Sequence, residues 1–292
     1  MVMKITETVT EPKKGVSYIM KAWKRFRRNP TVIFGLIIII VIILTAIFAP
    51  FIAPYDPTEM NYEKVYSPPG SEHLLGTDEL GRDLLSRIIF GARTSLTVGV
   101  VSVFILTFIG VFVGAIAGYM GGWVDDLLMR FTEIVMTIPS LFLLIVMISI
   151  FKVKGLHIIM MTIGLISWPQ MARVVRSEVL TIKERNYIEA AKSIGSSTFS
   201  IIFREILPNT IAPIIVMMTL RLANAIIIES SLSFLGLGDP TAITWGTMLS
   251  KGHVVIRSGW WIATFPGIAI LFTTMGFNLV GDGLRDALDV RM

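Results

Sequence analysis

The sequence contains no cysteine, and few of its residues carry charge. Without cysteine the chain can form no disulfide, no thiolate metal site and no cysteine nucleophile. Asp, Glu, Lys and Arg make up 16% of the 292 residues, whereas an ordinary soluble domain holds about 25%. Hydrophobic residues reach 53%, and the mean hydropathy is +0.73. The composition therefore excludes a water-soluble globule.

The sequence also lacks the residue patterns of an enzyme. It shows no Ser-His-Asp, His-Glu-x-x-His or paired-carboxylate pattern. Residues 76–83, GTDELGRD, have the Gly-x4-Gly spacing of a phosphate-binding loop, but Arg82 and Asp83 stand where that loop needs Lys and then Ser or Thr. The acidic residues Asp78, Glu79 and Asp83 lack a known metal-site spacing, so a solvated acidic loop is the better interpretation. We expect no catalytic, cofactor or metal site in this chain.

Long apolar runs are what the sequence has instead. Six of them are long enough to cross roughly 30 Å of hydrocarbon as helices. They fall at residues 31–53, 94–118, 127–150, 156–172, 211–234 and 261–281. The short alternating segments of a membrane β-barrel are absent from the sequence, so helices must satisfy the backbone in lipid. We therefore predict an all-α, polytopic membrane protein with six transmembrane helices.

Basic residues predict how the chain is oriented. Residues 1–30 are polar and basic, which is typical of a cytoplasmic anchor. With the N-terminus inside, the segments 1–30, 173–210 and the tail from residue 282 carry sixteen Lys and Arg, against eight in the outer segments. Because cytoplasmic segments are enriched in Lys and Arg, both termini are expected inside. The net charge of +5 is thus attributed to membrane flanks rather than to nucleic-acid binding.

Two polar segments are too long to be simple connections between helices. Residues 54–93 are rich in proline and acidic residues, and on this topology they form an outer loop. Residues 173–210 are predicted to be cytoplasmic and helical. A helical cytoplasmic segment between two spans is a candidate docking surface.

Glycine and proline mark positions of close packing or bending in the predicted spans. Gly110, Gly114 and Gly118 recur every four residues, so a neighbouring helix can approach this face closely. Pro139 and Pro169 remove backbone hydrogen bonds and predict kinks in the third and fourth spans. Such kinks can be static packing features or hinges for motion.

Several polar side chains fall inside the predicted spans, where such groups usually face a protein interior or a water-filled path. Arg130 and Glu133 are three residues apart and can pair, and Arg221 and Glu229 are close to two turns apart and can share a face. Two interpretations remain open, a lining of the translocation path or an interhelix polar network. The residues concerned are Arg130, Glu133, Arg221, Asn224 and Glu229.

The most specific stretch lies in the predicted cytoplasmic segment. Residues 187–195 read YIEAAKSIG, and Leu207 and Pro208 follow. Ala190 and Ala191 keep this helix thin enough to enter a groove. Gly195 permits a sharp turn, and Pro208 is suited to start the next helix.

This stretch resembles the EAA loop of ABC-importer permeases. In that family the short helix is the coupling helix, which sits in a cleft of the ATPase subunit. The resemblance implies that Glu189 meets cations or helix N-termini on the ATPase. It assigns ATPase coupling to Glu189, Ala190, Ala191, Gly195, Leu207 and Pro208.

Other segments narrow the resemblance to one subgroup. Residues 75–87, LGTDELGRDLLSR, 232–238, LSFLGLG, and 278–286, NLVGDGLRD, are similar to the C-type subunit of dipeptide, oligopeptide and nickel permeases. The resemblance implies that residues 31–292 form an ABC transporter transmembrane domain in the inner (cytoplasmic) cell membrane. It implies a cargo of di- or oligopeptides, with nickel or oligosaccharides as alternatives within the same architecture.

The resemblance also implies partners. They are a related B-type permease, two ABC ATPase subunits that bind ATP and Mg²⁺, and an extracellular or periplasmic substrate-binding protein. We expect the outer-loop residues Asp78, Glu79, Arg82 and Asp83 to form an outer gate or a contact with that binding protein. A standalone channel or secondary carrier is the alternative class, but the sequence shows no convincing inverted repeat.

Overall fold

The computed structural model describes residues 25–151 and 155–288. Within these ranges the chain folds into helices and contains no β-strand, which confirms the predicted all-α fold. Most of the predicted basic N-terminal segment lies outside the described residues. In order, the elements are α2 (Pro30–Ile47), α3 (Ala49–Ile52), the 3-10 turn η1 (Tyr62–Lys64), α4 (Leu84–Met120), α5 (Gly122–Thr137), α6 (Ser140–Ile150), α7 (Leu156–Lys183), α8 (Asn186–Ser193), α9 (Thr198–Ser200), the π-helical turn η2 (Ile201–Ile206), α10 (Leu207–Phe234), α11 (Trp245–Val254) and α12 (Trp260–Leu288).

Five helical stretches of the described chain are long and apolar enough to cross a membrane, and a bent helix pair makes a sixth span if it is counted as one. The five are α2, α4, α7, the continuous stretch from α9 to the end of α10, and α12. Many large apolar side chains of α2 are exposed, as lipid contact requires. The described chain thus reaches the predicted six spans only if the bent pair, α5 and α6, is counted as one span.

The third predicted span, residues 127–150, is not one helix. Helix α5 ends at Thr137, α6 begins at Ser140, and their axes meet at 89°. Pro139 lies at the break, where it has no backbone N–H to continue the helix. Pro169, by contrast, lies inside the uninterrupted α7. The prediction of a kink is confirmed at Pro139 in the stronger form of a break.

Helix boundaries differ from the predicted ones because capping and packing decide them more than apolar runs do. Helix α4 begins ten residues before the predicted span, since the Asp83 carboxylate caps it by accepting from the Ser86 N–H at 2.7 Å. Helix α7 continues eleven residues beyond the predicted fourth span, to Lys183. The loop between α3 and α4 is therefore shorter than the predicted outer loop, and both ends of the predicted cytoplasmic segment are helical.

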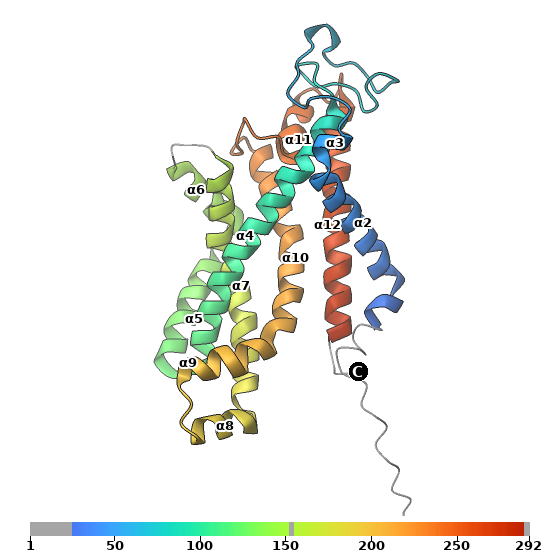
Figure 1. The fold of residues 1–292 in the computed structure, drawn as a ribbon. Helices are drawn as coiled ribbons and strands as arrows, with labels where there is room; N and C mark the ends of the chain where they lie inside the picture. The colour runs from blue at the N-terminus through green and yellow to red at the C-terminus, as the bar shows by residue number, and fades with distance from the viewer. Residues whose placement is uncertain (1–24, 152–154, 289–292) are drawn as a thin grey trace, which may run out of the picture.

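Helix α4 is the long diagonal of the molecule (Figure 1), and it packs most extensively on α7. At Gly114 a Cβ atom would lie 2.4 Å from the Ala172 carbonyl oxygen, and at Gly110 it would lie 2.6 Å from the Met171 Cβ. The predicted close helix approach along these glycines is confirmed. Two apolar clusters form the core, one around α4, α6, α7 and α10 and the other around α2, α4, α10, α11 and α12.

The two polar segments lie at opposite ends of the bundle. The loop between α3 and α4 lies beside α11 at the upper end of Figure 1, whereas α8 and α9 project at the lower end. This arrangement agrees with one segment on each side of a membrane.

Candidate functional site

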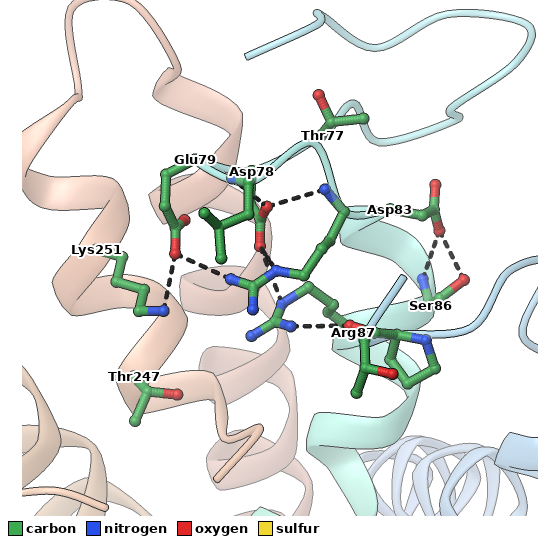
Figure 2. A network of polar contacts seen from close by, with 12 residues as sticks. Thr77, Asp78, Glu79, Asp83, Ser86, Arg87, Thr247 and Lys251 are labelled. Atoms are coloured by element: carbon green, nitrogen blue, oxygen red, sulfur yellow. Dashed lines mark hydrogen bonds and ion pairs between the residues drawn. The ribbon is translucent and has the colours of Figure 1, made fainter. Parts of the chain in front are cut away.

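A network of buried charges joins the outer loop to the helices beneath it (Figure 2). The Arg82 Nε donates to Asp78 Oδ2 at 2.8 Å, and the Arg82 backbone N–H donates to Asp78 Oδ1 at 3.0 Å. Arg87 Nε of α4 lies 3.2 Å from the same Asp78 Oδ2, as an ion pair without hydrogen-bond alignment. Asp78 is 2% exposed. The prediction of a solvated acidic loop was therefore wrong, because these carboxylates point inward.

Glu79 connects this network to α11. Its Oε1 accepts from Arg82 Nη2 at 2.9 Å and lies 2.8 Å from the Lys251 Nζ of α11 (Figure 2). Burial alone raises the pKa of Glu79, but the hydrogen bond from Lys251 and the charges of Lys251 and Arg82 outweigh it and lower that pKa. Glu79 is therefore ionised at neutral pH and holds both cations.

Asp83 ends the outer loop and starts α4. Its Oδ2 accepts from the backbone N–H and hydroxyl of Ser86, both at 2.7 Å, and its Oδ1 lies 2.9 Å from the Nδ1 of His73. The Trp261 Nε1 donates to the Thr77 carbonyl at 3.0 Å and ties the loop to α12. Sequence reasoning identified the charged residues but missed Arg87, Lys251 and Trp261, which fix them in place. The proposed outer-gate or binding-protein role of the four charged residues stays a prediction.

The polar residues of the predicted spans form two separate groups. Arg130 and Glu133 of α5 are exposed and line a cavity of about 540 Å³ between α5 and α7. Among the described residues neither side chain forms an ion pair, so the predicted pairing of the two was wrong. The opposite wall of the cavity comes from α7, which sequence reasoning did not identify.

The second group lies on α10 and is held by neutral partners. Glu229 is fully buried, and its Oε1 accepts from the Ser233 hydroxyl at 2.8 Å. Arg221 is half-buried, and in the described part of the chain its Nε has no hydrogen-bond partner. Asn224 is exposed and donates to the Leu220 carbonyl at 3.2 Å. The structure thus does not join Arg221 to Glu229 through an ion pair.

Four of the six predicted coupling residues lie on α8 and the turn that follows it. Glu189 and Ala190 are exposed, Ala191 is half-buried, and Gly195 has a φ of +81°. That φ lies in the left-handed region, which glycine adopts without strain. Beneath this surface Ile188 is fully buried in the core cluster that contains α7 and α10. Ile188 therefore joins α8 to the packed core of the spanning helices.

The sequence analysis missed two apolar residues of the same surface. Ile194 is 83% exposed and Tyr187 is 39% exposed. A large apolar side chain that is mostly exposed at one end of a helical bundle is a candidate for contact with another protein. The helical pattern of the sequence did not indicate the exposure of Ile194, because Ile194 follows α8 rather than lying within it.

The chain after α8 returns to the membrane through an unusual helix. From Ile201 to Ile206 the helix is wide, and the Leu207 N–H donates to the Ile202 carbonyl five residues earlier. Leu207 and Pro208 then begin α10, as predicted for Pro208. Lys183 Nζ, at the end of α7, donates to the Tyr119 carbonyl near the end of α4 at 2.5 Å. The Lys183 bond ties the end of α7, which α8 follows, to the end of α4.

An all-α bundle of five or six spans, with a segment that resembles the EAA loop, is typical of the membrane subunits of transporters. Residues 110–292 match the family of the binding-protein-dependent transport system inner membrane component. Residues 17–69 match the N-terminal TM domain of oligopeptide transport permease C. The chain belongs to the family of binding-protein-dependent transport system inner membrane components. It is accordingly an ABC-importer permease and not an enzyme, since ATP hydrolysis belongs to a separate subunit.

Curated relatives cover nearly the whole chain. It is 42% identical over 281 residues to the oligopeptide transport system permease protein OppC of Bacillus subtilis, covering 96% of this chain and 92% of that protein. It is 40% identical over 280 residues to the dipeptide transport system permease protein DppC of the same organism, at 95% and 87% coverage. It is 42% identical over 272 residues to the glutathione transport system permease protein GsiD of Escherichia coli, at 92% and 89% coverage.

A solved structure shares the fold. The match is a chain of the MetNI methionine ABC transporter in an inward-facing conformation, with a TM-score of 0.59 and 19% identity. It covers 70% of this chain and 98% of that chain. At this identity the similarity supports the fold alone.

Proposed function

We propose that this permease forms half of the membrane path for di- or oligopeptides in an ATP-driven importer. The observation that carries the proposal is the exposed α8 surface of Glu189, Ala190 and Ile194 above the buried Ile188. The relatives named for oligopeptide, dipeptide and glutathione transport support a peptide cargo.

In this proposal α8 is the coupling helix and docks in an ATPase subunit. Both termini and α8 face the cytoplasm, and the loop between α3 and α4 faces outward, across the cytoplasmic (inner) membrane. Basic residues on the α8 side support this orientation. The partners are a related B-type permease, two ATPases that bind ATP and Mg²⁺, and a substrate-binding protein.

The ATPases act on the path by favouring one conformation of the permease over another. ATP-bound partners must bind the α8 surface more tightly in one state, because equal affinity for both states shifts nothing. Ile188 belongs to the core cluster that also contains residues of α7 and α10, so displacement of α8 acts on these helices as well. The spans then alternate between inward-open and outward-open arrangements.

The test is purification of the assembled complex from its native membranes, followed by uptake of labelled peptide into proteoliposomes. We expect two ATPases and a second permease to co-purify, with peptide uptake that requires ATP. Glu189→Lys should lower uptake at least about tenfold, because reversing a charge at a buried contact costs about 2 kcal/mol or more. Recovery of this chain alone from active membranes would contradict the proposal, and ATP-driven uptake of nickel without peptide uptake would contradict the cargo.

A further inference from the structure

The cavity between α5 and α7 is lined by charges of both signs. Asp126, Arg130 and Glu133 come from α5, and Arg173, Arg176 and Ser177 come from α7. Its volume of about 540 Å³ lies within the usual range of small-molecule pockets. The residues of α5 recur at intervals of four and three, so one helix face carries them all.

One of these charges is already neutralised within the protein. Arg176 forms a bidentate pair with Asp125, with Nε to Oδ1 at 2.5 Å and Nη2 to Oδ2 at 2.6 Å. Asp125 is 8% exposed, so this pair holds α5 against α7. The other charged groups of the cavity take no part in this bidentate pair.

Four charged side chains of the cavity have no ion-pair partner in the described chain. They are two guanidinium groups and two carboxylates, on Arg130, Arg173, Asp126 and Glu133. The contact found for the Arg173 guanidinium is a weak one, 3.9 Å from the Met136 sulfur. The cavity therefore presents two positive and two negative groups that form no close ion pair in the described chain, although the charge of Asp126 also acts on Arg176.

Helix α5 has two faces of different character. Arg130 lies eight residues into α5, about 12 Å along its axis. A different face of α5 carries the exposed apolar residues Trp123, Leu127, Phe131 and Ile134. Helix α5 thus has an apolar face suited to lipid or protein contact, and a charged face that requires a protein or water surrounding.

We propose that this cavity binds the two charged ends of a peptide in transit. Arg130 and Arg173 receive the terminal carboxylate, and Asp126 and Glu133 receive the terminal ammonium group. This inference rests on the proposed function of peptide import, and it assigns a peptide-binding surface to this chain. A peptide with free ends is a zwitterion and matches the balanced charges, whereas an anionic lipid headgroup requires an excess of cations.

The first test places a peptide directly. The complete complex, reconstituted with ATPases and binding protein, is supplied with the tripeptide Ala-Ala-photoleucine, which has free ends, and is then illuminated. Labelling within residues 126–133 or 173–177, reduced by excess trialanine, is the expected result. Labelling confined to other segments of this chain or to the partner permease overturns the inference.

The second test uses variants and has two readouts. The double variant Arg130→Gln with Arg173→Gln should transport trialanine roughly tenfold more slowly, because charge-assisted bonds are lost. Its ATPase stimulation by the loaded binding protein should stay within about twofold, since α8 is untouched. Arg93→Gln is the matched control, because Arg93 is an exposed arginine of a spanning helix outside this cavity.

The outcomes distinguish failure of the proposed peptide import from failure of the proposed peptide-binding cavity. If the wild-type complex takes up no peptide with ATP, the proposed function fails, and this inference with it. If wild type transports trialanine and the double variant does so equally fast, only the inference fails. Loss of bound anionic phospholipid in the double variant, with normal uptake, assigns the cavity to a lipid headgroup and also overturns it.

Discussion

The Lys251 ammonium of α11 lies 2.8 Å from the Glu79 carboxylate of the outer loop. Glu79 also accepts from Arg82, so one carboxylate connects α11 with the buried charges above α4. The Lys251 side chain is 39% exposed, which limits the strength of this link. It is nevertheless a direct ionic connection between the outer loop and the segment joining α10 to α12.

The link predicts a pH-dependent difference in the free energy of unfolding between wild type and Lys251→Gln. Because the pKa of Glu79 is lowered in the folded state, the stabilisation is present above the ordinary value of about 4.3 and is lost as the pH falls through the lowered pKa. At pH 7 the free energy of unfolding of the variant should be lower than that of wild type by up to about 1 kcal/mol. Thermal unfolding in detergent should show this difference unchanged down to about pH 5. A difference that already vanishes near pH 6 would contradict the assignment, and Lys251→Arg should behave as wild type.

Removal of the central carboxylate of the network should loosen the outer loop. Asp78→Asn leaves the buried Arg87 without a counter-ion and leaves Arg82 with Glu79 alone, which costs about 3–5 kcal/mol. Hydrogen exchange of the backbone between residues 56 and 83 should become faster, whereas α7 should keep its protection. The control is Glu72→Gln, since Glu72 belongs to an exposed pair with Lys64, and it should leave exchange unchanged. Equal exchange in both variants would show that the network does not hold the loop.

Much of this fold could be predicted from apolar runs, and the exceptions have identifiable physical causes. Residues 235–260 read as an outer loop, yet they contain α11, in which Thr244 and Thr247 form a capping box. Helix α11 has ten residues and no long apolar run, so the sequence does not predict it as a membrane span. Their burial depends on contacts from far along the chain, such as the Trp245 Nε1, which donates to the Ile88 carbonyl at 3.0 Å.

The candidate sites were predictable to different degrees. The α8 segment was found because its residues are consecutive and specific, whereas Arg173 was missed as part of a site because it faces Arg130 only after α5 and α7 pack together. The burial of Asp78 was missed for the same reason, because its acidic neighbours in the sequence favoured a solvent-exposed loop. Its burial follows from Arg87, which lies on the next helix. Pairings between helices are decided by packing, which one sequence does not reveal.

Close packing of α4 on α7 predicts that glycine is required at position 114. In Gly114→Ala the added Cβ would lie 2.4 Å from the Ala172 carbonyl oxygen and 2.8 Å from the Val175 Cβ. The helices must move apart, at a cost of about 1–3 kcal/mol. Purified protein should therefore unfold at a lower temperature. Gly267→Ala in α12 is the control, because its Cβ would have an ordinary contact of 3.4 Å with Leu249. Similar unfolding temperatures for the two variants would contradict the close approach.

Exposure of Ile194 beside the predicted coupling helix predicts a role in binding rather than in folding. An apolar side chain that is 83% exposed contributes little to stability, so Ile194→Asn should leave the unfolding temperature unchanged. If the ATPase covers this residue, the variant loses buried apolar area and should retain the ATPases roughly tenfold less well. Retention is measured by washing the immobilised complex. Val254→Asn is the matched control, because Val254 is 82% exposed at the end of α11, at the opposite end of the molecule. Equal ATPase retention by both variants would exclude Ile194 from the contact, whereas a lowered unfolding temperature in Ile194→Asn alone would assign it to folding.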